Sequence, residues 1–590
     1  MRIERMFGYR RFACASLAAI FFSALAAPSP AAPAAAPPTI DDALAAIRAY
    51  APRAMAEQGA PGLSVAITDR THTLAIITLG YANVDAKTPV TPATRFAIGS
   101  ITKSMTALAL LELRDEHRID LNANVVRYLP WFSINSGGKS ILVHELLSHT
   151  AGTPDDYSLA PGYGFDIWAM RATHTLFAPG TSWSYSNDGL ATIGAILATV
   201  DRRPWPDALQ ARVLDPLGMA QTSPVFTPQT LADAAVGYEF RDADRPAPPH
   251  PALVASHAID FVDPAGSVIS TPEDMARYLR FYLNDGVANG RALLTPATFA
   301  AMTQPDRYRN GKAAGSATPV LSEAPQFYRQ YGYALSIFGN DPSSGGDHVI
   351  GHTGGVSGYT ACMQANLTRG FGAVAMSNLV EAPLHPCAIV LYAMRVLRAQ
   401  SLGEPLPPAP PAPADPALTP NGADYTGTYT AVDGSSLSVT GVTGRAAMID
   451  RGASYALYPR GPDIFWSSDP RFVLFLLHFG RNASRHVVDV TYGSQWFGNE
   501  RYYGPRTWSH PHRYDAYVGR YENTFWGSLS VTRVLVVKGR LTFDGLDPLT
   551  PRPDGSFTLG TDVIRFDAIA GGKAQRMTID AADLYRVELP

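Results

Sequence analysis

Ser100 and Lys103 are residue types that could together carry out nucleophilic catalysis. Three residues on a helix are close to one turn, so the two side chains would project next to each other. An amine that is partly desolvated there loses some of its preference for the proton and can take the proton of the hydroxyl. We therefore predict that Ser100 is a nucleophile and Lys103 its activator. The alternative is a capped helix that carries a surface lysine.

The same four-residue pattern occurs a second time, at Ser136 and Lys139. Gly137 and Gly138 separate that pair, and two glycines in a row disfavour a continuous helical turn. The side chains of the second copy are therefore not expected to converge.

Tyr185 and Asn187 could supply proton transfer and substrate contacts. A phenol beside a cationic amine ionises more easily and can relay a proton to a leaving group. In an extended segment, Asn187 points the same way as Tyr185 and can hydrogen-bond a substrate amide. Tyr-x-Asn occurs elsewhere in the chain, where ordinary packing is the better interpretation.

A glycine-rich stretch between predicted strands includes His352, Thr353, Gly354 and Gly355. Glycines there let a substrate backbone approach closely and pair along the strand edge. The backbone N–H groups of Gly355 and Ser100 could form an oxyanion hole. A plain turn between strands is the alternative. The similar segment 149–152 is predicted to be only the C-terminal cap of a helix.

The elements that must position these residues can be read from the surrounding pattern. Gly99 permits a sharp turn, and apolar residues recur at helical spacing after Ser100. Helices are also predicted at 40–56, 141–149, 190–200, 272–283 and 384–399, and strands at 61–67, 73–79, 331–338, 348–351, 359–367 and 371–376. Strands at both ends with helices between them predict one antiparallel sheet covered by helices. Segment 222–262 is proline-rich and is predicted to be an irregular surface excursion.

The chain after residue 400 has a different character. Residues 401–420 are dense in proline and alanine, as in a semi-rigid linker. Short alternating strands follow, and Tyr425, Leu437 and Pro459 recur at one constant interval as Tyr517, Leu529 and Pro551. A repeat in register predicts two duplicated β modules, each a small barrel or strongly curved sheet.

The N-terminal residues resemble an export signal, with arginines before the apolar run 12–25 and small residues at 24–26. We expect a periplasmic or secreted protein, although a membrane anchor is the alternative interpretation. An oxidising compartment would allow Cys362 and Cys387 to pair, and two free thiols are the other possibility. The net charge of -3 and the lack of a basic run argue against a nucleic-acid partner. No cysteine and histidine cluster has metal-ligand spacing, and no cofactor is implied.

Taken in order, the three motifs closely resemble those of the penicillin-recognising serine hydrolases, a family that includes class C β-lactamases, DD-peptidases, D-aminopeptidases and esterases. Segments 146–152 and 185–189 also look like family phrases. The resemblance implies an α+β fold of the β-lactamase/transpeptidase type over residues 39–400. It also implies an acyl-enzyme on Ser100, acid and base work by Lys103 and Tyr185, and substrate binding by Asn187 and residues 352–355.

One departure from the family bears on substrate choice. Family members that act on β-lactams or DD-peptides usually carry lysine where this chain has His352, and histidine is largely neutral near pH 7. A substrate carboxylate would be held less firmly here, which favours the D-aminopeptidase and esterase branches.

These interpretations combine into one prediction. We predict an exported hydrolase that acts on esters or amides of small D-amino-acid or peptide substrates, with cell-wall fragments as one candidate source. The alternatives are a β-lactamase or DD-peptidase, and a non-catalytic protein that binds or senses cell-wall ligands. The predicted organisation is a signal peptide (1–27), a spacer (28–38), the hydrolase domain (39–400), a linker (401–420) and two β modules (421–510 and 511–590). By their strand pattern, the two β modules resemble the lipocalin-like domains appended to such hydrolases. The sequence does not fix the oligomeric state.

Overall fold

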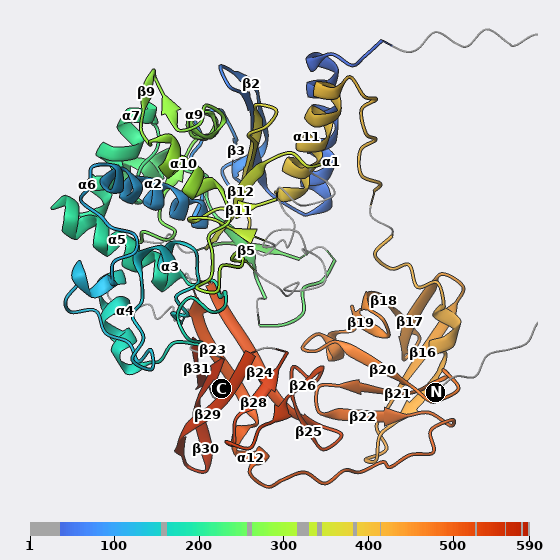
Figure 1. Ribbon diagram of the computed structural model, residues 1–590. Helices are drawn as coiled ribbons and strands as arrows, with labels where there is room; N and C mark the ends of the chain where they lie inside the picture. The colour runs from blue at the N-terminus through green and yellow to red at the C-terminus, as the bar shows by residue number, and fades with distance from the viewer. Residues whose placement is uncertain are drawn as a thin grey trace, which may run out of the picture. The chain divides into compact units, whose positions relative to one another are not determined.

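A computed structural model gives the arrangement of the chain (Figure 1). It describes residues 36–154, 162–242, 244–249, 251–256, 262–315, 330–338, 345–380, 386–412, 415–525, 528–560, 562–579 and 582–587. The predicted export signal and residues 28–35 of the predicted spacer lie outside these ranges.

An eight-stranded antiparallel sheet forms the centre of the hydrolase part, in the order β10-β11-β12-β13-β14-β1-β2-β3. Its strands are β1 (Gly62–Asp69), β2 (Thr73–Asn83), β3 (Thr88–Pro89), β10 (Gln330–Tyr331), β11 (Ser336–Ile337), β12 (Val349–Val356), β13 (Tyr359–Asn366) and β14 (Phe371–Ser377). The first strands of the domain pair with its last ones, since β1 lies between β2 and β14. Strands from both ends of the domain therefore share one sheet, as the sequence predicts.

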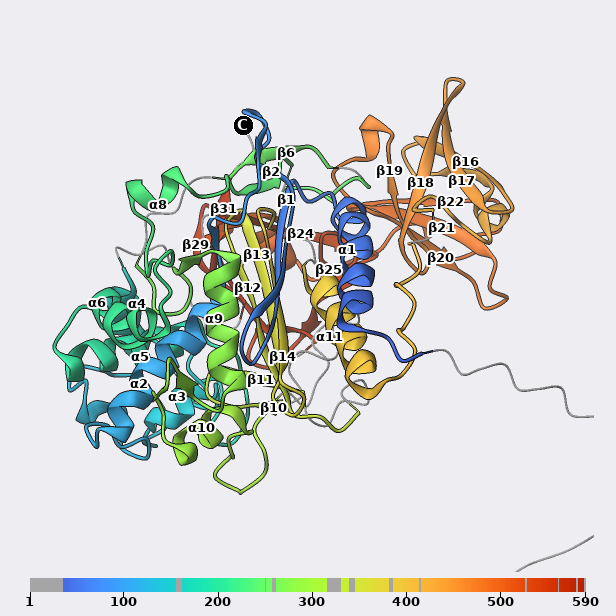
Figure 2. The same cartoon turned by 90° about the horizontal axis from the view of Figure 1, so that it is seen from above.

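Helices cover both faces of this sheet, which explains why β14 is buried along its whole length. Figure 2 shows α1 and α11 on one face and α9 on the other. The helices are α1 (Ile40–Glu57), α2 (Thr102–Asp115), α3 (Val143–Leu147), α4 (Tyr163–Ala169), α5 (Asn187–Asp201), α6 (Trp205–Leu209), α7 (Asp215–Leu217), α8 (Pro228–Ala232), α9 (Pro272–Leu283), α10 (Pro296–Thr303) and α11 (Cys387–Leu402), with short η1 (Gly99–Ile101), η2 (Val125–Arg127), η3 (Met170–Ala172) and the π-helix η4 (Gln210–Leu214).

Local signals explain where several of these helices begin. Thr39 caps α1 by accepting a hydrogen bond from the Asp42 N–H, and the Asp42 carboxylate accepts one from the Thr39 N–H. Thr271 caps α9 by accepting a hydrogen bond from the Asp274 N–H, with Pro272 at the first helical position. The helix predicted at 190–200 begins earlier, at Asn187, because Ser186 is its cap.

Segment 222–262 contains short regular elements where the sequence predicts an irregular excursion. It includes α8 and the two-stranded ribbon of β5 (Tyr238–Phe240) and β6 (Leu253–Ala255). Proline at the first turn of α8 is compatible with a helix, so the proline content was a poor guide there. Two more ribbons pair β4 (Phe96–Ala97) with β7 (Ile269–Ser270) and β8 (Val287–Ala288) with β9 (Arg291–Ala292).

Two all-β parts follow residue 420. Strands β15 (Gly427–Thr430), β16 (Ser436–Val442), β17 (Arg445–Asp450), β18 (Ala453–Gly461), β19 (Ile464–Ser467), β20 (Leu477–Arg481), β21 (Val487–Tyr492) and β22 (Gln495–Gly498) close into a barrel. Strands β23 (Gly519–Phe525), β24 (Ser528–Val537), β25 (Arg540–Phe543), β26 (Asp547–Pro548), β27 (Thr550–Pro551), β28 (Phe557–Leu559), β29 (Asp562–Ala570), β30 (Lys573–Ile579) and β31 (Ala582–Val587) form a nine-stranded sheet. Its edge strands are β26 and β27, which only Leu549 separates in the chain, so the two edges are brought together.

Both all-β parts begin with the same local structure. A short helical turn, η6 (Gly422–Tyr425) or α12 (Tyr514–Tyr517), precedes the first strand. A buried tyrosine of that strand, Tyr429 or Tyr521, then donates its hydroxyl to the backbone oxygen of the tyrosine four residues earlier, at 2.8 Å in each case. The repeat seen in the sequence therefore corresponds to a repeated structural unit.

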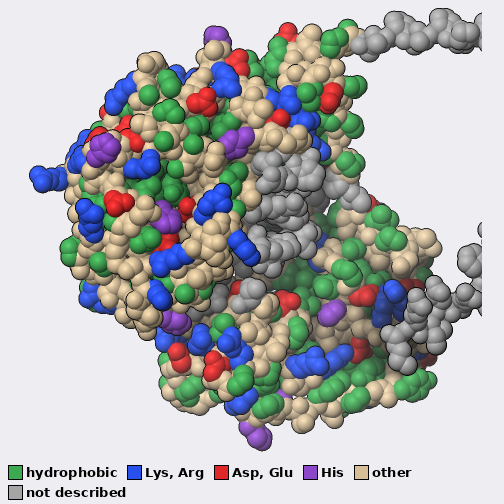
Figure 3. Space-filling model, in the orientation of Figure 1, with side chains coloured by type: hydrophobic (Ala, Val, Ile, Leu, Met, Phe, Trp, Pro, Cys, Tyr) green, Lys and Arg blue, Asp and Glu red, His purple; other side chains and the backbone are tan. Residues whose placement is uncertain are grey.

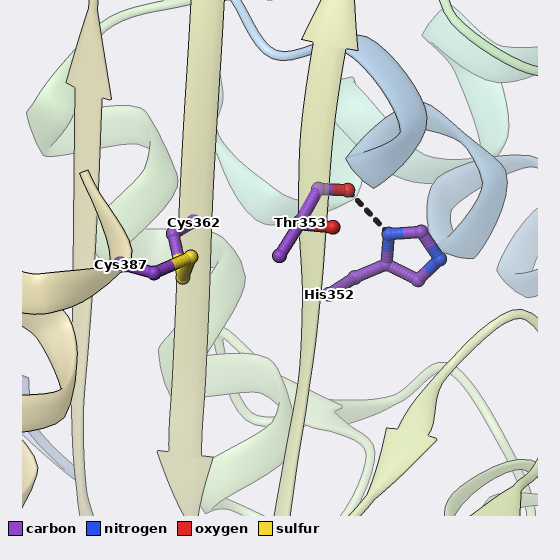
Figure 4. Close-up of a disulfide and its surroundings, with 4 residues drawn as sticks. All are labelled: His352, Thr353, Cys362 and Cys387. Atoms are coloured by element: carbon purple, nitrogen blue, oxygen red, sulfur yellow. Dashed lines mark hydrogen bonds between the residues drawn. A yellow bond between two sulfur atoms is a disulfide. The ribbon is translucent and has the colours of Figure 1, made fainter. Parts of the chain in front are cut away.

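The structure joins Cys362 of β13 to Cys387 at the start of α11 in a disulfide (Figure 4). The bridge links the central sheet to a helix that covers it. On the face seen in Figure 3, basic and acidic side chains are interspersed, in keeping with the small net charge. Within the described ranges, no helix is long and apolar enough to cross a membrane.

Candidate active site

Ser100 lies in the tight turn that leads into α2. Gly99 has a φ of 50°, a value that glycine adopts without strain. Ser100 belongs to the 3-10 turn η1, and α2 itself begins at Thr102, so Ser100 does not cap the helix as its position in the sequence suggested. Two contacts fix the chain just before this turn. Strand β4 pairs with β7, and the Ile98 N–H donates to the Val268 oxygen at 3.0 Å. The half-buried hydroxyl is thus presented on a fixed support.

Lys103 is fully buried beside that hydroxyl. Its Nζ donates hydrogen bonds to Ser100 Oγ and to the backbone oxygen of Ala265, both at 2.8 Å. A buried amine beside a hydroxyl is the arrangement needed to accept the hydroxyl proton. In the second Ser-x-x-Lys copy, Ser136 Oγ instead donates to the Lys139 backbone oxygen at 2.5 Å, and Lys139 is exposed where Lys103 is buried. The two copies therefore differ as the glycines between Ser136 and Lys139 predict.

Tyr185 reaches the same centre from the segment before α5. Lys103 Nζ lies 5.0 Å from the centroid of the Tyr185 ring. Asn187 is buried and is the first residue of α5, two residues after Tyr185. The structure thus brings Ser100, Lys103 and Tyr185 together, while their catalytic roles and that of Asn187 in substrate binding stay predictions.

Strand β12 lies directly against the serine turn. A Cβ atom on Gly99 would lie 2.6 Å from the Gly355 nitrogen, and one on Gly354 would lie 3.2 Å from the Ser100 nitrogen. The two backbone N–H groups proposed for the oxyanion hole therefore come from neighbouring segments. Gly99 and Gly354 must both be glycine, because no side chain fits between β12 and the turn that carries Ser100.

The end of β12 offers a strand edge to a substrate. Within the described ranges, β11 pairs with β12 only at Ile350 and Gly351, so Thr353 to Gly355 have no strand partner on that side. Gly355 is exposed, and a Cβ atom placed on it would meet nothing within 4 Å. An extended substrate could pair with this edge.

The two neighbouring glycines of β12 give a matched pair of substitutions. Gly354→Ala is expected to destabilise the fold by about 1–3 kcal/mol, because its Cβ would overlap the Ile98 carbonyl group. It should also lower turnover at least about 10-fold by displacing Ser100. Gly355→Ala adds the same methyl group in open space, so its free energy of unfolding should stay near that of the parent. Urea unfolding measures the free energy of unfolding and ester hydrolysis measures the turnover of Gly354→Ala. Equal destabilisation by the two variants would contradict this account of β12.

His352 is buried, and both of its ring nitrogens are used within the protein. Nδ1 donates to the Thr353 backbone oxygen at 2.5 Å (Figure 4), and Nε2 accepts the Tyr331 hydroxyl at 2.8 Å. Burial and the charge of Lys103 lower the pKa of His352 to about 4, although the bond to the Thr353 oxygen opposes this shift. The imidazole is therefore neutral at physiological pH. Its predicted role in substrate binding stays a prediction, and a neutral ring with both nitrogens occupied supplies no cation for a carboxylate.

This burial makes stability depend on pH. A histidine in the unfolded chain has a pKa near 6.5, so between pH 6.5 and about 4 the unfolded state binds more protons than the folded state. The free energy of unfolding should therefore fall as the pH is lowered through this window, by up to about 3 kcal/mol from this group. His352→Gln removes the contribution, and urea unfolding at several pH values should show a flatter profile. An unchanged profile would show that His352 titrates normally in the folded protein.

Two residues near the site were missed by the sequence interpretation. His149 was expected to belong only to a helix cap, and Tyr331 was expected only as a strand residue. The ring centroid of His149 lies 4.4 Å from that of Tyr185 and 4.9 Å from that of Tyr331. Segment 146–152 resembles a family phrase, which was the only available signal for His149. Across the described ranges, no three His, Cys, Asp or Glu side chains gather as metal ligands.

Comparison with known proteins identifies the family to which the chain belongs. The family model described as Beta-lactamase matches residues 47–388, more than half of the chain. Protein flp of Staphylococcus aureus (strain NCTC 8325 / PS 47) is 25% identical over 329 residues, which cover 54% of this chain and 60% of that relative. An uncharacterised protein of Mycobacterium tuberculosis, MT1414, is 27% identical over 272 residues, which cover 41% of this chain and 67% of that protein.

The fold is also found in a solved structure. An octameric penicillin-binding protein homologue from Pyrococcus abyssi superposes with a TM-score of 0.53 at 22% identity, covering 77% of this chain and 99% of that one. This likeness agrees with the β-lactamase/transpeptidase-like sheet described above. The family match over residues 47–388 shows that the chain belongs to the beta-lactamase family, a family of serine hydrolases, and the solved structure shows the fold.

Proposed function

We propose that the chain is an exported serine hydrolase that cleaves esters or amides of small D-amino-acid or peptide substrates through an acyl-enzyme on Ser100. The observation that carries the proposal is the buried amine of Lys103, which lies 2.8 Å from Ser100 Oγ. Such a pair is suited to nucleophilic attack on a carbonyl carbon and needs no metal for it.

In the acylation step, Ser100 Oγ attacks the carbonyl carbon while the unprotonated Lys103 amine takes the hydroxyl proton. The carbonyl oxygen becomes an oxyanion, which the N–H groups of Ser100 and Gly355 stabilise. The bond to the leaving group then breaks, and Tyr185 passes a proton to that group. Its ring lies 5.0 Å from Lys103 Nζ, so the positive charge of the amine that has taken the proton favours loss of the phenol proton to the leaving group.

In the deacylation step, water attacks the acyl group on Ser100. The same basic groups take the water proton, and Ser100 leaves with a proton returned from them. The acid product then departs and the free enzyme is restored. An alcohol or amine in place of water would give acyl transfer.

The neutral state of His352 supports a preference for substrates that lack a carboxylate at this position. A β-lactam or a DD-peptide presents a carboxylate, which a fixed cation at this position would hold. Here both imidazole nitrogens are hydrogen-bonded, to the Tyr331 hydroxyl and to the Thr353 oxygen, and the low pKa of His352 keeps the ring uncharged. We therefore favour the D-aminopeptidase or esterase type over a β-lactamase or DD-peptidase. The disulfide between Cys362 and Cys387 supports an oxidising, periplasmic or secreted location.

The test is hydrolysis of a short-chain p-nitrophenyl ester by the purified mature protein. Turnover would justify a panel of D-alanyl amides, D-alanyl esters and β-lactams. Preferential cleavage of the D-alanyl substrates is the expected result. Efficient hydrolysis of penicillins, or stable labelling by them, would favour the β-lactamase or DD-peptidase alternative. Inactivity on the whole panel would favour a protein that only binds its ligand.

A further inference from the structure

His149 occupies a backbone position that is uncommon for residues other than glycine. It follows the end of α3 with a φ of 59°, in the left-handed region that residues other than glycine seldom adopt. Such conformations cost free energy and persist where the surrounding structure requires them. The side chain is only 2% exposed. A strained and buried histidine beside Tyr185 calls for an explanation beyond helix capping.

The hydrogen bonds of His149 hold the residues on both sides of Tyr185. The Ser184 N–H donates to the His149 backbone oxygen at 3.0 Å. The Ser186 N–H donates to His149 Nδ1 at 3.1 Å. The imidazole also packs against the Tyr185 ring, with the centroids 4.4 Å apart. His149 therefore restrains Tyr185 through three contacts: two hydrogen bonds to its neighbours in the chain and one contact with its ring.

The imidazole must be neutral to do this. An N–H donor faces Nδ1, so Nδ1 carries the lone pair and Nε2 carries the hydrogen. Burial is the largest cause that lowers the pKa of His149 well below its usual value, and the charge of Lys103 adds to it. Within the described ranges, Nε2 is buried without a hydrogen-bond partner. Nδ1 is therefore the ring atom through which His149 binds the Ser186 N–H.

We infer that His149 is a positioning residue for Tyr185, and that its Nδ1 holds the Tyr185 segment in the site by accepting the Ser186 N–H. The inference rests on the proposed function for its effect on turnover. Its structural half, the bond from Ser186, stands independently of any activity.

Two variants separate the acceptor atom from the bulk of the ring. His149→Phe keeps an aromatic ring against Tyr185 but has no acceptor. His149→Asn loses the ring but places an oxygen where Nδ1 stood, and asparagine tolerates positive φ better than most residues. We expect kcat on a p-nitrophenyl ester to fall about 10- to 100-fold in His149→Phe, with KM little changed. His149→Asn should recover most of that loss.

A double-mutant cycle shows whether the effect passes through Tyr185. In a Tyr185→Phe background, His149→Phe should cause little further loss of kcat, because the group that it positions is already gone. A loss of the same factor in both backgrounds would overturn the inference. So would a His149→Phe variant with the kcat of the parent.

Hydrogen exchange provides a readout that does not depend on activity. Mass spectrometry of a peptide covering residues 181–190 should show faster exchange at the Ser186 amide in His149→Phe, and protection close to that of the parent in His149→Asn. Unchanged protection in both variants would overturn the inference even if the parent hydrolyses esters. If the parent hydrolyses nothing but the exchange result is as expected, the positioning holds and the proposed function fails.

Discussion

Replacing Ser100 by alanine is expected to lower kcat/KM for ester hydrolysis by at least about 10³-fold, because no other group can form the acyl-enzyme. The fold should persist, since Ser100 is half-buried in a turn held by β4 and β7, and alanine removes only the hydroxyl. Removing the hydroxyl leaves Lys103 with the Ala265 oxygen as an acceptor. Initial rates and thermal unfolding of parent and variant check both statements.

The chain supplies its own control for this substitution. Ser136→Ala alters the second Ser-x-x-Lys copy, in which the hydroxyl donates to the Lys139 backbone oxygen. That variant should retain the activity of the parent. Residual turnover in Ser100→Ala above about 10% of the parent rate would mean that another nucleophile operates, and the acyl-enzyme on Ser100 would have to be abandoned.

Replacing Lys103 by methionine is the second substitution with a large expected effect. Methionine has a similar length and suits the buried site, but it cannot take a proton. We expect kcat to fall about 10²- to 10⁴-fold, the range typical for loss of a general base. Lys103→Arg should be comparably inactive although it keeps the charge, because a guanidinium does not deprotonate in proteins.

The matched control is Lys139→Met, in the exposed copy, which should leave kcat unchanged. Lys103→Met should also raise the pKa values of His149 and His352, since the Lys103 charge is one cause of their depression. Titration of both histidines by NMR would detect this. Full activity in Lys103→Arg would show that the positive charge, and not proton transfer, is what the site requires from residue 103.

Much of the fold follows from local sequence signals. The Gly99 turn, the apolar stripe of α2 and the Thr271 cap of α9 each depend on residues within a few positions of one another, and the structure confirms them. The repeat after residue 420 predicted two β modules because a duplicated segment folds alike in both copies. Helix ends were less well predicted. For example, α5 begins at Asn187, because the Ser186 hydroxyl accepts the Gly189 N–H as a helix cap and donates to the distant Pro154 oxygen, a contact that the helical pattern does not reveal.

The candidate site also has features that local sequence predicts and features that depend on tertiary packing. The sequence by itself determined the pairing of Ser100 with Lys103, since one helical turn sets it, and it separated this copy from Ser136 and Lys139 through two glycines. Only the tertiary structure placed His149 against Tyr185 and the hydroxyl of Tyr331 on His352. These contacts join segments far apart in the chain, and they depend on how α3, β10 and β12 pack. Local residue patterns set backbone conformation over a few residues, whereas burial and the partners of a buried polar group are decided by the packed core as a whole.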